Sequence, residues 1–330
     1  MNIRTIKYLL IALLLPFYAG CNKNADTIPS AEGMPVVFSL GFGVTTRSTL
    51  DNVWPDNTRI AISKGSGNVL SYYTPENSAS AGSGNAVTLT TDASNMLSWP
   101  STNPGWTFTA WYPYSAAAPT GITVANDQSN ITDVIYYGYD IMYAPQVANI
   151  YQATVPLIFY HQMSRVVATV NTDNTTNKET VTSVTFGEGT NDIRVSGTLT
   201  PGVTGGATTI ADRWSTTSAT DSYITMRKTS TETEETSHIY TFECMLPSQS
   251  GGSSDKTLLK ITTSYTEDET QKSHTYIYKA AYDLKPGYQN NYYITCKEGN
   301  VIIIITSTVA GWNSTTVHKE GGAYIPDNQY

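Results

Sequence analysis

Residues 35–46 read Pro-Val-Val-Phe-Ser-Leu-Gly-Phe-Gly-Val-Thr-Thr. Every second position carries a large apolar side chain, in the order Val36, Phe38, Leu40, Phe42 and Val44. Successive side chains of a β-strand point to opposite faces, so a period of two places these five on one face. The stretch therefore predicts a strand with one buried face.

The rest of the chain repeats this pattern in short pieces. Strand-like segments such as Arg59–Ser63, Asp133–Tyr137 and a long one at Val155–Val170 alternate with segments rich in Gly, Pro, Asn and Ser. No interval has a helical period longer than a turn or two. Many short strands joined by turn residues favour an all-β protein built from sandwiches or barrels.

The N-terminus predicts export. Arg4 and Lys7 precede an apolar run that is too short to span a membrane, and the small residues Ala19 and Gly20 precede Cys21. Tyr18-Ala19-Gly20-Cys21 resembles a bacterial lipobox, in which the cysteine is acylated. We predict a signal peptide over residues 1–20, lipidation at Cys21 and a tether over 21–34. The alternative is an ordinary signal peptide that contains a cysteine.

The length of the chain predicts two domains. Cleavage after residue 20 leaves 310 of the 330 residues, enough for two separate cores. We place an N-terminal sandwich at 35–152, a C-terminal sandwich at 153–312 and a polar tail at 313–330.

Charge and cysteine usage exclude several classes of function. The formal net charge is −8, and it becomes −10 once Arg4 and Lys7 are removed, so nucleic acid is a poor partner. Cys244 and Cys296 lie on apolar faces of predicted strands, where a buried reduced pair and a disulfide are both plausible. Neither has a second Cys or His at ligand spacing, so we expect no metal site.

The chain carries no catalytic motif. It has no Gly-x-Ser-x-Gly, His-Glu-x-x-His or Cys-x-x-Cys sequence, no Walker loop and no dinucleotide fingerprint. His161 is expected to be a hydrogen-bonded structural histidine near the domain junction. We therefore predict no enzyme, no catalytic residue and no cofactor.

Clustered aromatic residues raise a second function. Trp111, Tyr112 and Tyr114 surround Pro113, and exposed aromatic faces can stack on sugar rings. Alternation also explains such residues as core or cross-strand pairs. The alternative function is therefore a surface lipoprotein that binds glycans through these three residues.

Six segments occur in the order found in one known family. They are Tyr18-Ala19-Gly20-Cys21, Thr46-Arg47-Ser48, Trp111-Tyr112-Pro113-Tyr114, Asp140-Ile141-Met142-Tyr143-Ala144, Phe159-x-His161-x-x-Ser164-Arg165, and Leu284-Lys285-Pro286-Gly287 through to Trp312. Together they resemble the fimbrillin family, the Mfa-like and FimA-like subunits of type V fimbriae in Gram-negative anaerobes. The resemblance spans nearly the whole mature chain.

The resemblance implies a fold and a maturation route. The fold would be two transthyretin-like Greek-key β-sandwich domains in tandem. The lipidated precursor would reach the outer membrane, where a trypsin-like protease cuts behind the first strand, here between Arg47 and Ser48. The strand at 35–46 would then leave, and a strand from a neighbouring subunit would fill the groove.

The residues support the same idea independently. Five apolar side chains would be uncovered, at roughly 1.5–3 kcal/mol each, or about 7–15 kcal/mol before entropy is subtracted. The net stability of a domain is itself about 5–15 kcal/mol. Such a groove should bind a complementary strand by β-strand addition.

One segment departs from the family. The C-terminal segment is the expected donor strand, yet Thr315–Tyr330 contains Gly321-Gly322 and Pro326 and little alternation. We therefore expect a tip or accessory subunit of type V fimbriae that serves cell adhesion, located at the outer membrane and in the fimbrium.

Overall fold

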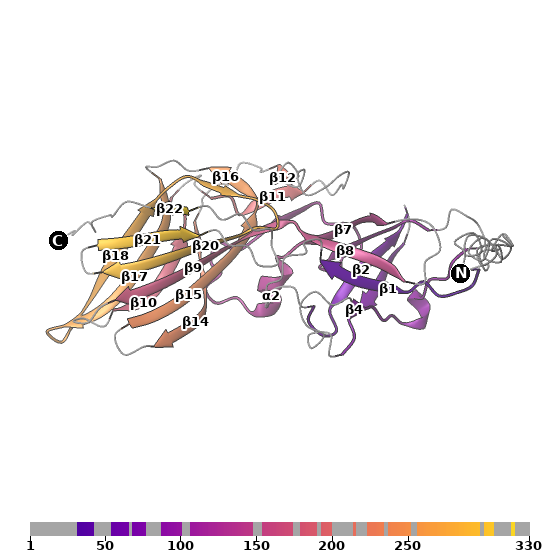
Figure 1. Cartoon of the computed structure of the whole chain (residues 1–330), viewed down its shortest axis with the longest axis horizontal. Coiled ribbons are helices and arrows are strands. Elements are labelled where there is room, and N and C mark those ends of the chain that lie inside the picture. The colour runs from indigo at the N-terminus through magenta and orange to yellow at the C-terminus, as the bar shows by residue number, and fades with distance from the viewer. Residues whose placement is uncertain are drawn as a thin grey trace, which may run out of the picture.

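A computed structural model describes most of the chain between residues 32 and 320. The described ranges are 32–42, 54–65, 68–76, 87–100, 106–147, 154–173, 179–189, 193–199, 214–215, 223–233, 237–251, 256–297, 300–306 and 318–320. The fold is nearly all β, as predicted. Figure 1 shows an elongated molecule with one group of strands at each end and a short helix, α2, between them.

The first group forms a single seven-stranded sheet. Its order is β3-β2-β5-β7-β8-β1-β4. The strands are β1 (Phe38–Phe42), β2 (Arg59–Lys64), β3 (Val69–Tyr73), β4 (Val87–Thr88), β5 (Phe108–Tyr112), β7 (Met142–Val147) and β8 (Val155–His161), and the 3₁₀ turn η2 covers Ala93–Asn95. All pairings are antiparallel except that of β1 with β8, which is parallel.

The second group contains two larger sheets. The six-stranded one has the order β14-β15-β9-β20-β21-β22, with β14 (Arg227–Thr233), β15 (Ser237–Pro247), β9 (Met163–Asp173), β20 (Gln289–Lys297), β21 (Asn300–Thr306) and β22 (His318–Glu320). The four-stranded one has the order β13-β10-β17-β18, with β13 (Ile224–Thr225), β10 (Thr180–Phe186), β17 (Thr257–Glu267) and β18 (Thr270–Lys279).

Two small sheets complete the second group. One has the order β12-β11-β6, with β12 (Trp214–Ser215), β11 (Ser196–Leu199) and β6 (Gly121–Thr123); the other pairs β16 (Gln249–Gly251) with β19 (Tyr282–Leu284). Strand β6 precedes β7 in the chain but pairs with β11. The first half of the chain therefore contributes an element to the second group.

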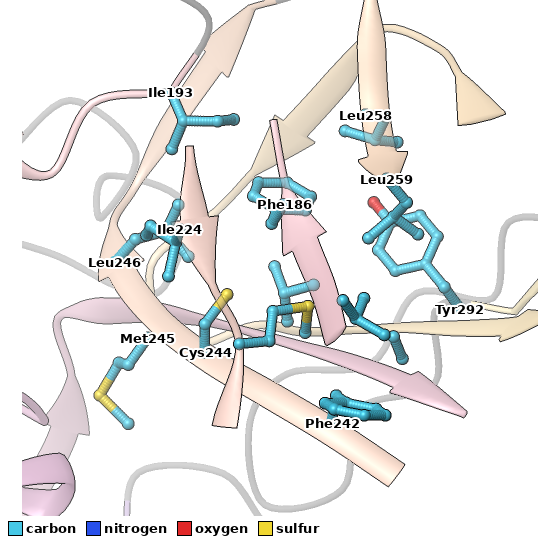
Figure 2. Packing of buried hydrophobic residues seen from close by; sticks show 14 of the residues in the cluster. Phe186, Ile193, Ile224, Phe242, Cys244, Met245, Leu246, Leu258, Leu259 and Tyr292 are labelled. Carbon is cyan, nitrogen blue, oxygen red and sulfur yellow. The ribbon is translucent and has the colours of Figure 1, made fainter. Parts of the chain in front are cut away.

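Buried apolar side chains form two main clusters. One gathers residues between Val36 and Phe159 around Phe38 and Phe108, both fully buried. The other lies between the sheets of the second group, where Phe186, Cys244 and Tyr292 are among the side chains drawn in Figure 2. Cys244 and Cys296 are both free and buried, which answers the question left open by the sequence.

The two clusters do not divide the chain at a single residue. Val155, Leu157 and Phe159 of β8 pack in the first cluster, whereas Met163 at the start of β9 packs in the second. Val124 and neighbouring residues also join the second cluster. The two-domain division at 152/153 and its Greek-key connections stay predictions.

The expected single strand at Val155–Val170 is wrong in one respect, because it is broken at Gln162. The Gln162 N–H donates to the carbonyl of Ile141 at 2.7 Å, and its side-chain Nε2 donates to the Tyr160 carbonyl at 2.7 Å. The bond to Ile141 extends the register of β7 with β8 by one residue, and from Met163 onward the chain pairs with β15, so β8 and β9 belong to different sheets.

The expected strand at Asp133–Tyr137 is also wrong, because these residues form helix α2 (Asp133–Gly138). Thr132 caps the helix, since its side chain accepts a bond from the Ile135 N–H at 3.4 Å, and Asp133 supplies a negative charge in the first turn. Local capping here outweighs the β propensity of Val, Ile and Tyr.

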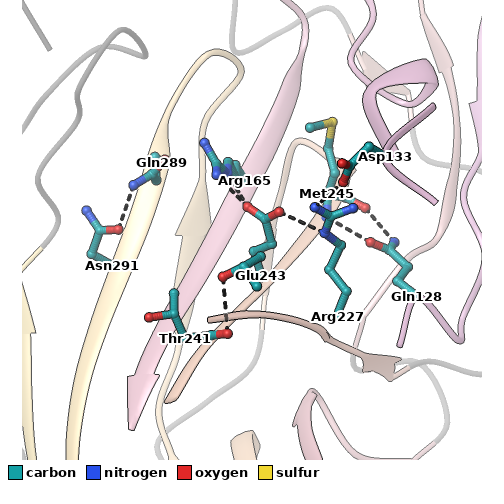
Figure 3. Close-up of polar contacts among 10 residues, drawn as sticks. Gln128, Asp133, Arg165, Arg227, Thr241, Glu243, Met245, Gln289 and Asn291 are labelled. Atoms are coloured by element: carbon teal, nitrogen blue, oxygen red, sulfur yellow. Dashed lines mark hydrogen bonds and ion pairs between the residues drawn. The ribbon is translucent and has the colours of Figure 1, made fainter. Parts of the chain in front are cut away.

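A buried carboxylate links α2 to the six-stranded sheet. Glu243 of β15 accepts a bond from Arg165 Nε at 2.9 Å and pairs through its other oxygen with Arg227 Nε at 2.9 Å. Arg227 also binds Asp133 of α2 at 2.7 Å (Figure 3). Its guanidinium lies 4.3 Å from the ring centre of Tyr136. Charge pairing thus fixes the helix against β14 and β15.

Substitution of Glu243 tests this network. Glu243→Gln leaves two partly buried guanidinium groups without their shared charge, and removing one partner of a buried pair costs about 3–5 kcal/mol. We expect the free energy of unfolding, measured by urea titration followed by fluorescence, to fall by that amount. Glu232→Gln, an exposed control on neighbouring β14, should change it by less than about 0.5 kcal/mol. Equal midpoints for the two variants would contradict the assignment.

Candidate functional site

Strand β1 lies inside the first sheet, between β8 and β4. It pairs in parallel with β8 over five positions, from Phe38 opposite Val155 to Phe42 opposite Phe159. On its other side it pairs with β4 at only two positions. The first residues of the segment add two more backbone bonds, from the Val36 N–H to the Leu97 carbonyl at 2.8 Å and from the Val155 N–H to the Val37 carbonyl at 2.8 Å.

The predicted alternation is confirmed where side chains are described. Val36, Phe38 and Leu40 are 4%, 0% and 1% exposed, while Val37 and Ser39 are half-buried. Phe42 belongs to β1 by its backbone. Val44, the proposed cleavage position at Arg47 and Ser48, and Cys21 lie outside the described residues, so their assigned roles stay predictions.

Phe38 is at the centre of an aromatic cluster. Its ring meets Tyr72 edge to face at 5.1 Å between centroids and Phe108 at 4.9 Å. Phe108 in turn contacts Trp99 at 6.0 Å. Edge-to-face pairs contribute about 0.5–1.5 kcal/mol beyond area burial. Phe38 and Leu40 of β1 are therefore part of the core, although β1 precedes the other described strands in the chain.

Trp54 anchors the chain downstream of the proposed cleavage position. It is 2% exposed and packs edge to face on Phe159 of β8 at 5.2 Å and on Tyr112 of β5 at 5.9 Å. No sequence motif singled out Trp54, because its contacts depend on strands more than 50 residues away.

The structure separates the three residues suggested for glycan contact. Trp111 is 2% exposed, and its Nε1 donates to the carbonyl and hydroxyl oxygens of Ser115 at 3.2 and 3.0 Å. It is a core residue without a free face, which is a correction to the sequence interpretation. Tyr112 and Tyr114 are half-buried and line a cleft.

That cleft has a volume of about 630 Å³. It lies between the turn before β2, the turn after β5 and helix α2. Its lining residues are Pro55, Asp56, Asn57, Thr58, Arg59, Tyr112, Pro113, Tyr114, Asp133, Val134 and Tyr137. Burial, with Asp140 and Tyr137 nearby, raises the pKa of Tyr112 to about 12, so its hydroxyl stays protonated at neutral pH.

His161 and Asp140 form a buried pair at the end of β8. The imidazole Nδ1 lies 2.8 and 2.9 Å from the two carboxylate oxygens, and the residues are 6% and 7% exposed. This agrees with the expected hydrogen-bonded structural histidine. The two residues are 21 positions apart and no spacing pattern joins them, so sequence reasoning did not identify Asp140 as the partner of His161.

The described residues provide few features expected of a catalytic or metal site. No group of three or more His, Cys, Asp or Glu side chains among them is arranged to hold a metal ion. Burial raises the pKa of the Cys244 thiol well above its ordinary value, so the reactive thiolate is suppressed. None of the helices in the described ranges has the length and hydropathy needed to cross a bilayer.

Among the solved structures similar to this chain are two cell adhesion candidates that share its fold. A candidate cell adhesion protein from Bacteroides uniformis aligns with a TM-score of 0.53 and 18% identity, covering 82% of this chain and 95% of that one. A candidate cell adhesion protein from Bacteroides ovatus aligns with a TM-score of 0.53 and 14% identity, covering 89% and 98%. At these identities the likeness establishes the fold alone.

Sequence comparison establishes the family. No curated protein matches the chain. The fimbrillin-like family profile matches residues 46–312, well over half of the 330 residues, and the family consists of structural subunits at the cell surface. The chain therefore belongs to the fimbrillin-like family and is a fimbrial or adhesin-like subunit.

Proposed function

We propose that this chain is a subunit of type V fimbriae, assembled by protease-triggered strand exchange and used for cell adhesion. The first strand, residues 35–46, would leave after cleavage between Arg47 and Ser48 by a trypsin-like protease. A strand from a neighbouring subunit would then pair with β8 in its place. The division into sandwiches at 35–152 and 153–312 is part of the same proposal.

One observation carries the proposal: β1 is inserted in a sheet whose other strands come from later residues. We call the groove that β1 fills between β8 and β4 the slot. Its partners β8 and β4 both follow the proposed cut, and so do Tyr72 and Phe108, which contact Phe38. Cleavage after Arg47 would leave the walls of the slot in the core fragment. Only the segment that contains β1 would become separable from the core.

The energy of the slot favours refilling. The three described buried side chains of the segment, Val36, Phe38 and Leu40, contribute about 4.5–9 kcal/mol at roughly 1.5–3 kcal/mol each. The five residues of β8 that lie in register with β1 would also lose their neighbouring strand, and the backbone groups that face it would lose their partners. An incoming strand would restore both the apolar burial and the backbone pairing, which is the basis of recognition by β-strand addition.

Trp54 would anchor the new N-terminal segment of the cleaved protein to the core. It lies six residues beyond Ser48 in the sequence and is buried against Phe159 and Tyr112. The freed chain would stay attached to the core at this point.

Lipidation and position in the fibre complete the proposal. Acylation of Cys21 would hold the precursor at the outer membrane, since each buried acyl CH₂ contributes roughly 0.8 kcal/mol. Thr315–Tyr330 is a poor donor strand because of Gly321, Gly322 and Pro326. A tip or accessory subunit therefore fits better than the main shaft subunit.

Limited trypsin digestion of the purified precursor tests the cleavage. We expect mass spectrometry to find an N-terminal fragment that ends at Arg47 and a core that begins at Ser48. Arg47→Ala should abolish that boundary and leave other cuts unchanged. A first cut elsewhere, with the 47–48 bond intact, would contradict the proposal.

A labelled peptide tests the slot. A fluorescent peptide of residues 35–46 should bind the trypsin-cut protein, measured by anisotropy, because it can replace the severed strand. The same peptide with Phe38→Asp should bind at least tenfold more weakly, since a buried unpaired carboxylate is costly. Uncut Arg47→Ala protein provides the matched control and should bind neither peptide. Equal binding of both peptides would overturn strand exchange at this slot.

A further inference from the structure

The cleft beside α2 differs from the slot of β1 in place and in chemistry. Figure 1 places α2 between the two groups of strands. The cleft volume of about 630 Å³ lies within the usual range for ligand sites, about 300–1,000 Å³. Every residue that lines it follows Arg47 in the sequence, so all of them remain in the chain if the first strand is removed.

Three tyrosines supply the aromatic walls. Tyr112 and Tyr114 come from the end of β5 and the turn after it, and Tyr137 comes from α2. Tyr112 is held by its edge-to-face contact with buried Trp54, and Tyr137 is 47% exposed. Their presence in one cleft puts flat, electron-rich surfaces within reach of a single ligand.

Arg59 is positioned at the same cleft by two contacts. Its Nε donates to Ser71 Oγ at 2.7 Å, and its guanidinium lies 3.6 Å from the ring centre of Tyr114. Among the described residues no carboxylate pairs with Arg59. The stacking fixes the guanidinium plane, and its terminal N–H groups form a fork suited to two neighbouring oxygen atoms.

Further planar polar groups surround the tyrosines. Asn57 and Asp133 line the cleft, and Asp133 is oriented by its 2.7 Å ion pair with Arg227. Amide, carboxylate and guanidinium groups each bind two adjacent hydroxyls in one plane. Apart from the prolines, Val134 is the one aliphatic residue among the described residues that line the cleft. This described lining therefore offers no deep pocket for an apolar peptide anchor.

From this combination we propose that the cleft between β2, β5 and α2 is a carbohydrate-binding site. The apolar C–H faces of the sugar rings stack on Tyr137 and Tyr112, and the hydroxyls bind Arg59, Asn57 and Asp133. The site goes beyond assembly by strand exchange, because none of its residues belongs to β1 or its partners β8 and β4. It would give the subunit a surface for contact with glycans.

The test is a glycan array probed with the full-length protein, carrying neutral and uronic-acid oligosaccharides together with a proline-rich peptide. Titration calorimetry with the strongest binding oligosaccharide then compares variants. We expect Tyr137→Ala and Arg59→Ala to weaken binding by about tenfold, because each removes one stacking or bidentate contact.

Tyr223→Ala is the matched control, since Tyr223 is also 47% exposed but does not line the cleft. It should change the affinity by less than twofold, and melting temperatures should confirm that all variants are folded. The proposal is overturned if no oligosaccharide binds, if only the peptide binds, or if Tyr137→Ala and Tyr223→Ala behave alike.

Discussion

The insertion of Phe38 between Tyr72 and Phe108 is the contact on which the first half of the molecule depends. It brings a strand from the start of the chain into the centre of a core made by residues up to Phe159. The strand is held by backbone bonds on both sides and by its apolar face. Because one segment supplies all of these contacts, its removal exposes a single continuous slot rather than scattered defects. Proteins rarely leave such apolar surface uncovered, which supports the proposed replacement by an equivalent strand.

The junction between the two groups of strands is held by polar contacts. Gln162 ends β8 by bonding to Ile141 and Tyr160, and the His161–Asp140 pair lies next to it. Glu243 and Arg227 then fix α2 against the second group. These bonds have strict geometry, so the junction keeps α2 at a fixed position beside β5. The wall of the aromatic cleft formed by α2 depends on this position.

The sequence predicts those parts of the fold that depend on local periodicity. The alternation at Val36, Phe38 and Leu40 identifies both the strand and its buried face, and the turn-rich composition identifies the all-β class.

Features that depend on distant partners are not predictable in this way. Trp111 lies in an aromatic segment of the kind that can form an exposed sugar-binding surface. The pairing of β5 between β2 and β7 buries it instead. The helix at Asp133 has strand-like residues, and only the Thr132 cap and the Arg227 contact explain it. The cleft combines Arg59, Tyr112 and Tyr137, which are separated by tens of residues, so no motif could have assembled it.

The most direct test is the N-terminus of the protein in fibres taken from the cell surface. If β1 is exchanged during assembly, intact-mass and N-terminal analysis of fibre-bound protein should find chains that begin at Ser48 and lack the acylated segment. Fibre-bound chains that still begin at Cys21 and retain residues 35–46 would contradict the account.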